Sequence, residues 1–411
     1  MKKIVSIFLW IIVIAAAVIM SSLLIAKTNE ALRVFNGNYT KNETTGENDE
    51  TQTTNAPKIT EAATAAPEPE IELNLYGGDL ELPVIGATGY ASVDMDLIIV
   101  NEQNVNEVVT RLRAGTAFVI LWEENDWWYV AVGGTGGTVG WVMHAHSMIN
   151  LPDVVPSIIY NNYNAYKAEF MSGGEPIPGL HGEKLYSYSV RSDGKVYNER
   201  LQKYEYIVPV LYSTAKRVCK AQKNALDNGD TLVIYEAFRP YPAQTKMYNA
   251  FVDFINKNPH IGENINSGQW NTSWFIASGV SSHQRGYTVD AGLAKAVTKD
   301  YEETGGYHYL QITQSGNYEM PTFFGELSIK SAVYQYPVQI NSFDAWKSAE
   351  YSEPMQKNAH ARSLQKYFTD ADFTPLASEW WHFNDLHTMN GVTKQCDGNF
   401  EITDCFSTAP K

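Results

Sequence analysis

The sequence predicts an α+β fold in which a small all-β unit precedes a larger unit of helices and strands. The chain has 411 residues, 44% of them hydrophobic, which is enough for two folded units and additional segments. Residues 73–150 show short alternating strands separated by glycine-rich turns. Residues 156–394 place helical patterns before paired strands, an order that favours an α+β domain over a doubly wound one.

The N-terminal residues predict a membrane anchor. Two lysines precede an uninterrupted apolar run at 4–26, which is long enough to cross a bilayer as a helix and favours a cytoplasmic N-terminus. A cleaved signal peptide is the alternative, but its apolar region should be shorter and end at a small-residue cleavage site. We therefore expect an uncleaved anchor at 1–27 and a disordered linker at 28–72, rich in Thr, Asn, Glu, Ala and Pro. The protein would be single-pass in the cell membrane, with its folded units extracellular.

The net charge and the cysteine content limit the partners and metal sites that the chain can have. A formal net charge of −15 argues against a nucleic-acid partner, because phosphate binding requires a basic face. Cys396 and Cys405 bracket part of the C-terminal tail, 395–411, and are expected to pair in an oxidising compartment. Cys219 lies in a helical pattern and is expected to be buried. Since no cysteine pair has zinc-site spacing, any metal here must use histidine and carboxylate.

The stretch "LRAGTAFVILWEENDWWYVAVGGTGGTVGWV" within 73–150 contains hairpin patterns at small-barrel spacing. It resembles bacterial SH3-like domains, and the resemblance implies binding of a wall polymer. Trp127, Trp128 and Trp141 are candidates for a ligand platform, although filling the core of a small barrel is at least as strong an interpretation for two of them. The neighbouring His-x-His, residues 144–146, is expected to be solvated.

Two short segments together supply a set of metal ligands. His283 and Asp290 lie in "SSHQRGYTVDAGL", and Glu379 and His382 lie in "SEWWHFN". Each pair alone has a high false-positive rate, but catalytic zinc requires three N or O ligands and one open position, and His283, Asp290 and His382 supply three. Glu379, three residues before a ligand, can then serve as the general base.

Arg239 in "EAFRPYPAQ" is a candidate partner for the developing charge or for a substrate carboxylate. It follows a predicted strand, and its guanidinium offers a planar fork of donors for either task. A surface ion pair is the competing interpretation.

The three segments, in this order, resemble the zinc D,D-peptidases of the hedgehog-related metallopeptidase group over residues 156–394. The closest resemblance is to the VanX-type D-alanyl-D-alanine dipeptidases of vancomycin resistance. It implies one Zn²⁺ per chain, held by three ligands, His283, Asp290 and His382. It also implies Glu379 as catalytic base and Arg239 as the arginine that binds the transition state or the carboxylate. The implied reaction is hydrolysis of the bond between two D-alanines at a free C-terminal carboxylate.

Further substrate contacts are expected at Ser281, by the same resemblance, and at one of the two tryptophans beside the base. Of Trp380 and Trp381, one should line the pocket and raise the pKa of Glu379 by desolvation, while the other packs in the core. We assign Trp381 to the pocket.

One departure from the dipeptidase pattern affects the expected substrate. Those enzymes carry "M-G-T-x-F-D", whose aspartate holds the ammonium of the free dipeptide, whereas this chain has "MPTFFGE" with Gly325 at that place and Glu326 next to it. Loss of the counter-charge should weaken binding of a buried ammonium but not of an amide nitrogen. A D,D-carboxypeptidase acting on peptidoglycan stem peptides is therefore preferred, and D-Ala-D-Ala dipeptidase activity is the alternative. A non-catalytic cell-wall-binding protein is the alternative of another class, although the complete ligand set and base argue against it.

Overall fold

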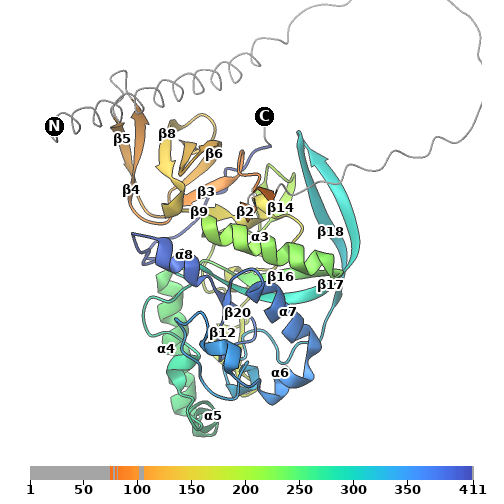
Figure 1. The fold of residues 1–411 in the computed structure, drawn as a ribbon. Helices are drawn as coiled ribbons and strands as arrows, with labels where there is room; N and C mark the ends of the chain where they lie inside the picture. The colour runs from red at the N-terminus through yellow and green to blue at the C-terminus, as the bar shows by residue number, and fades with distance from the viewer. Residues whose placement is uncertain (1–74, 77–78, 81, 101–105, 410–411) are drawn as a thin grey trace, which may run out of the picture. The chain divides into compact units, whose positions relative to one another are not determined.

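The computed structural model describes residues 75–76, 79–80, 82–100 and 106–409 (Figure 1). The predicted anchor and linker lie outside these residues. No helix within the described ranges is both long and apolar enough to cross a membrane. The described residues of 73–97 and 109–409 belong to one compact unit. The unit mixes helices with largely antiparallel sheets, which confirms the α+β class.

The first sheet has eight strands in the order β15-β9-β3-β6-β7-β8-β4-β5. Its bounds are β3 (Thr88–Ala91), β4 (Met95–Val100), β5 (Asn106–Leu112), β6 (Ala117–Glu124), β7 (Trp127–Val132), β8 (Thr138–Met143), β9 (Ser147–Asn150) and β15 (Pro209–Leu211). A separate two-stranded sheet is formed by β1 (Leu75–Tyr76) and β2 (Asp79–Leu80). Strand β15 belongs to the predicted peptidase range, yet it pairs antiparallel with β9, with Val210 opposite Ile149. The sheet therefore joins the two predicted domains.

Two of the three candidate platform tryptophans are core residues. Trp128 is fully buried and Trp141 is nearly so, whereas Trp127 is half-buried. Trp128 packs edge-on against Tyr212 at 4.7 Å between ring centroids. The interpretation that they fill a core thus holds for two of them.

The expectation that His144 and His146 are solvated is wrong. His144 is half-buried and packs its ring on Trp128 and Tyr212. His146 is buried, with its Nε2 atom 3.2 Å from the Thr393 hydroxyl. Both histidines lie in a short 3₁₀ turn that faces other parts of the unit rather than solvent.

The second sheet has six strands and contains the predicted site. Strands β10-β16-β17-β20-β19 follow in that order, β18 also pairs with β17, and only β10 and β16 are parallel. The bounds are β10 (Ile159–Tyr160), β16 (Asp230–Glu236), β17 (Thr288–Thr304), β18 (Tyr307–Asn317), β19 (Thr374–Pro375) and β20 (His382–Asn384). Two further hairpins are β11 (Glu169–Ser172) with β12 (Glu175–His181), and β13 (Val196–Asn198) with β14 (Lys203–Glu205).

Helices α3 (Tyr212–Asp227) and α7 (Ala359–Thr369) lie side by side over this sheet (Figure 1). Buried α3 residues recur at the three- and four-residue spacing of one helix face, among them Ala215, Val218 and Cys219. From α7, Phe368 stacks on Phe383 of β20 at 4.1 Å. The remaining helices are α2 (Leu151–Val154), α4 (Tyr241–Lys257), α5 (Pro259–Ile265), α6 (Glu353–Lys357) and α8 (Leu386–Gly391).

The C-terminal tail has no regular secondary structure in its described part, and its two cysteines are free thiols. The predicted disulfide is therefore not formed, because the Cys405 sulfur faces the Thr88 hydroxyl instead of Cys396. Cys396 is buried in a cluster with Phe238 and Ile402, and the Cys405 sulfur lies 3.4 Å from the Thr88 hydroxyl. Cys219 is buried as predicted, and burial raises its pKa to about 12.

Candidate metal centre

The register of the central strands brings the predicted ligands together. Asp290 in β17 lies opposite His382 in β20. Because side chains alternate along a strand, Val289 and Ala291 point into the core while Asp290 points into the site. His283 precedes β17 in a turn that closes at Gly286, whose φ is +75°. A Cβ on that glycine would lie 3.2 Å from the Met148 sulfur, so both the backbone conformation and the packing favour glycine there.

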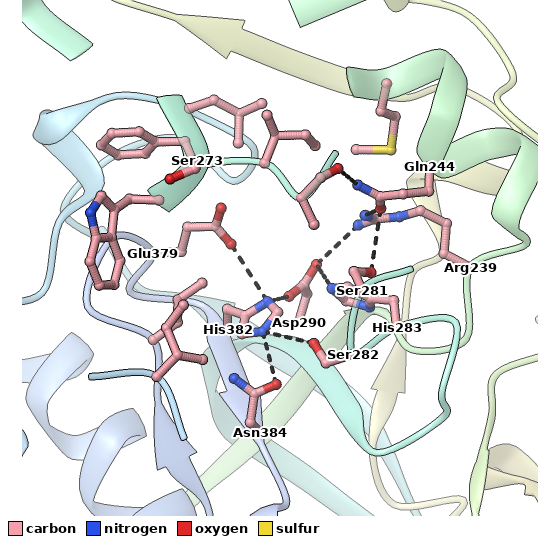
Figure 2. A pocket seen from close by; sticks show the side chains of 18 of the residues that line it. Arg239, Gln244, Ser273, Ser281, Ser282, His283, Asp290, Glu379, His382 and Asn384 are labelled. Atoms are coloured by element: carbon pink, nitrogen blue, oxygen red, sulfur yellow. Dashed lines mark hydrogen bonds and ion pairs between the residues drawn. The ribbon is translucent and has the colours of Figure 1, made fainter. Parts of the chain in front are cut away.

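His283, Asp290 and His382 form a compact, buried group whose ligand atoms all lie within 4.8 Å of one another. His382 Nδ1 is 3.1 Å from Asp290 Oδ1, and His283 Nε2 is 3.5 Å from Asp290 Oδ2 (Figure 2). Sequence positions 283, 290 and 382 thus meet at one point, as predicted. The arrangement could hold a metal ion.

The hydrogen bonds of the two imidazoles fix which nitrogens face the centre. His283 donates from Nδ1 to the Ala237 carbonyl at 2.7 Å, and His382 Nε2 lies 3.2 Å from Asn384 Oδ1, an acceptor. In neutral imidazoles these contacts leave His283 Nε2 and His382 Nδ1 with lone pairs directed at Asp290. Among the described residues, His382 Nδ1 and Asp290 Oδ1 are buried without a hydrogen-bond partner. A cation satisfies such converging lone pairs, so the donor set fits a metal.

Asp290 is ionised in this environment. Burial opposes ionisation, but the His283 and His382 rings, when protonated and hydrogen-bonded to the carboxylate, outweigh it and lower the pKa of Asp290 well below its usual range. One carboxylate and two imidazoles are ligands that suit zinc and several other divalent metals.

Glu379 lies across from the ligands, with Oε2 3.5 Å from His382 Nδ1 (Figure 2). Its side chain is buried, and burial raises its pKa to about 8, helped by the Asp290 carboxylate and opposed by His382 and Arg239. A cation held by the three ligands would lower this pKa again, because a nearby positive charge favours the carboxylate. Glu379 is therefore beside the ligand group, and with a cation bound there it would be ionised and able to accept a proton.

Arg239 is a buried member of the site rather than a surface ion pair. It donates from Nε at 2.9 Å and from a second nitrogen to the carboxylate of Glu236, and its other terminal nitrogen donates to Gln244 Oε1 at 2.7 Å. One of its terminal nitrogens lies 3.9 Å from Asp290 Oδ2 in the ligand group. Burial opposes the guanidinium charge, but Glu236 and Asp290 outweigh it and raise the pKa of Arg239.

Glu236 and Gln244 were missed as site residues in the sequence, although both lie in or beside the segment that contains Arg239. Glu236 lies opposite Asp290 in the sheet register and is fully buried. It also accepts a hydrogen bond from the Tyr186 hydroxyl at 2.9 Å. Gln244, in the first turn of α4, accepts a hydrogen bond from Arg239 and donates one to the Ala277 carbonyl at 2.8 Å. Glu236 and Gln244 together therefore clamp the Arg239 guanidinium in one orientation.

Ser281 and Trp381 both line the cavity next to the ligand group, which has a volume of about 260 Å³. The Ser281 hydroxyl donates to Gln284 Oε1 at 2.7 Å. Trp274, Val280 and Ile340 are among the apolar side chains of the cavity wall. The cavity thus has a polar end at the ligands and Arg239 and an apolar wall.

The second tryptophan has a different place. Trp380 is buried in the main core and donates from its indole nitrogen to the Thr322 hydroxyl at 2.9 Å. This position agrees with the expectation that one indole faces the cavity while the other packs behind it.

Glu326 points away from the cavity, into the turn between β11 and β12. Its carboxylate accepts hydrogen bonds from the backbone of Gly173 at 2.6 Å and of Gly174 at 3.1 Å. Gly325 has a φ of +84°, and a Cβ there would approach the Phe170 ring at 3.2 Å. The carboxylate next to the missing aspartate is therefore engaged in holding a backbone turn.

No family model matches the chain, and no curated protein matches it significantly.

Proposed function

We propose that the protein is an extracytoplasmic zinc metallopeptidase that removes the terminal D-alanine from peptidoglycan stem peptides. The observation that carries the proposal is the meeting of His283, Asp290 and His382 with Glu379 and Arg239 in one buried cavity. Three N and O ligands with an adjacent carboxylate suit metal-assisted hydrolysis, and a clamped guanidinium suits an anionic substrate group.

In this proposal each residue of the chain has a separate task. Zinc, when bound, supplies a Lewis acid that polarises the scissile carbonyl and acidifies water. Glu379 takes the proton from the attacking water and returns it to the leaving amine, for which its position 3.5 Å from His382 Nδ1 is suitable. Arg239 faces the developing oxyanion or the terminal carboxylate, held in one orientation by Glu236 and Gln244. Ser281 contacts the substrate beside it.

The surroundings of the cavity favour a stem peptide over a free dipeptide. Among the described residues that line it, the carboxylates are Asp290 and Glu379, both needed for the metal and the base. Glu326 is held by backbone amides elsewhere, so no further described lining carboxylate remains for a substrate ammonium. An amide nitrogen, as in a stem peptide, needs no counter-charge. We also propose that residues 1–27 anchor the enzyme in the membrane and that residues 73–150 bind a wall polymer.

The test is release of D-alanine by the full-length chain, purified in detergent, from a stem pentapeptide and from free D-Ala-D-Ala. We expect faster release from the pentapeptide, loss of release with a chelator, and recovery with zinc. Faster release from the free dipeptide would favour the dipeptidase alternative. No release from either substrate, with zinc bound, would favour a non-catalytic wall-binding protein.

Glu379→Gln separates catalysis from metal binding. The variant should keep one zinc per chain and lose about 100- to 10,000-fold in kcat, the usual contribution of a general base. Glu353→Gln is the matched control, because Glu353 is an exposed residue of α6. Normal turnover in Glu379→Gln would remove that residue from the base role.

A further inference from the structure

The C-terminal tail reaches the residues that surround Arg239. At its inner end the Gly398 carbonyl accepts a hydrogen bond of 2.7 Å from the backbone N–H of Tyr241, the first residue of α4. Gly398 also packs on Gln284, so that a Cβ added to this glycine would lie 2.6 Å from the Gln284 Cβ. Its φ of +64° is a second reason for glycine at this position. The tail therefore contacts both α4 and the loop that precedes β17.

Gln284 connects this contact to two predicted substrate-facing residues. It is fully buried, and its amide nitrogen donates to the Arg239 carbonyl at 2.8 Å. Its amide oxygen accepts from both the backbone N–H and the hydroxyl of Ser281, each at 2.7 Å. A displacement of Gln284 would thus move Arg239 and Ser281 together.

A second contact of the tail supports the strand end that leads to Arg239. Phe400 stacks on Phe238, the residue before Arg239, with ring centroids 4.9 Å apart and planes 13° from parallel. Ile402 is fully buried in the same cluster as Phe238. These apolar contacts fix the middle of the tail against the back of the site.

The outer end of the tail is tied to the eight-stranded sheet. The Tyr90 hydroxyl donates to the Asp404 carbonyl at 3.0 Å, and the backbone N–H of Phe406 donates to the Thr88 hydroxyl at 3.0 Å. The backbone N–H of Thr408 donates to the Gly86 carbonyl at 2.7 Å. Figure 1 shows the C-terminal segment leaving α8 and ending beside these strands. The tail thus spans from the β3 region to the predicted arginine site.

We infer that residues 396–408 form a strap that positions Arg239 and Ser281 through Gln284, and that the eight-stranded sheet is the fixed point of this strap. The inference rests on the proposed function for its effect on turnover. Gln284 and Gly398 are positioning residues, because they act through Arg239 and Ser281. The eight-stranded sheet that holds the strap then supports catalysis, in addition to binding any wall polymer.

The test compares Gly398→Ala with Gly391→Ala in the full-length chain. Gly391 ends α8, and a Cβ added there would meet no atom within 4 Å, so its substitution is a matched control. Gly398→Ala should lower kcat/KM for the stem pentapeptide by about 100-fold, the scale on which a misplacement of 1 Å acts, while one zinc per chain is retained. Both kcat and KM should change, because Arg239 and Ser281 move together. Gln284→Ala should reproduce the effect with the strap sequence intact.

Hydrogen–deuterium exchange provides a readout that does not depend on activity. In Gly398→Ala, and in a chain that ends at Thr403 and so lacks the outer contacts, the peptide around Tyr241 should exchange faster than in the wild type and in Gly391→Ala. If exchange of the peptide around Tyr241 is unchanged in these chains, the tail does not act as a strap. Faster exchange with wild-type kcat/KM overturns its positioning role. If the wild-type chain releases no D-alanine, the proposed function is wrong. The hydrogen–deuterium exchange of the peptide around Tyr241 then still decides whether the strap exists.

Discussion

Glu236→Ala should be among the most destabilising single substitutions in the protein. The Glu236 carboxylate is fully buried and accepts hydrogen bonds from two nitrogens of Arg239 and from the Tyr186 hydroxyl. Without it, Arg239 keeps its bond to Gln244, but its charge is left in a buried position. Removing one partner of a buried ion pair costs about 3–5 kcal/mol, because the other charge remains desolvated. We expect a loss of this size in the free energy of unfolding.

The assay is urea unfolding followed by the fluorescence of the ten tryptophans. Glu353→Ala, which removes an exposed α6 carboxylate paired with Lys357, is the control and should leave the unfolding midpoint nearly unchanged. The double substitution Glu236→Leu with Arg239→Met should recover most of the stability, because it leaves no unpaired charge. A Glu236→Ala chain as stable as the control would refute the reasoning.

The same substitution should also weaken metal binding. Arg239 already lies 3.9 Å from Asp290 Oδ2, and without Glu236 its nearest carboxylate is that of the proposed ligand. An arginine paired with Asp290 competes with a cation for the same oxygen. We therefore expect a higher zinc dissociation constant in Glu236→Ala, measured by competition with a chromophoric chelator. Unchanged zinc affinity would show that Arg239 stays in place without Glu236.

Three further outcomes test the centre and its surroundings. Asn384→Ala removes the acceptor that orients His382 and should weaken zinc binding by about 10- to 100-fold; unchanged affinity would contradict the assigned orientation of the ring. Chelation should lower the thermal unfolding midpoint and zinc should restore it, since a ligand of the native state stabilises that state; an unmoved midpoint argues against a native metal site. Asp153→Ala should cost about 3 kcal/mol in urea unfolding, because it strands buried donors of Thr88, Asn150 and Asn198; a cost below about 1 kcal/mol would contradict this account.

The sequence was sufficient to predict the residues whose chemistry is restrictive. His283, Asp290 and His382 could be chosen because metal ligation needs those side chains, and two short motifs supply them. Glu236 and Asn384 were not chosen, because their roles depend on strand register and on the tautomer of a neighbouring ring. The Ala237 carbonyl that orients His283 has no side-chain signature at all. Residues that orient other residues of a site are therefore the ones that cannot be recognised from a single sequence.

The errors in prediction have a common physical origin. Cys396 and Cys405 were expected to pair on compartment and spacing alone, yet the segment between them is held by Phe400 and Ile402 in an apolar cluster. His146 was expected in solvent, yet it lies against Thr393, 247 residues along the chain. In both cases long-range packing decided the position, and no local pattern reports such contacts.

The pairing of β15 with β9 affects how this protein can be divided or recombined. A fragment that begins at residue 156 would leave β15 without its neighbour and present unpaired backbone donors and acceptors to other chains. Such a fragment is expected to aggregate or to recruit a foreign strand. Exchanging the N-terminal module for another would meet the same difficulty unless the replacement supplied an edge of matching register. Any change made in one part of the chain must therefore preserve the pairing of β15 with β9.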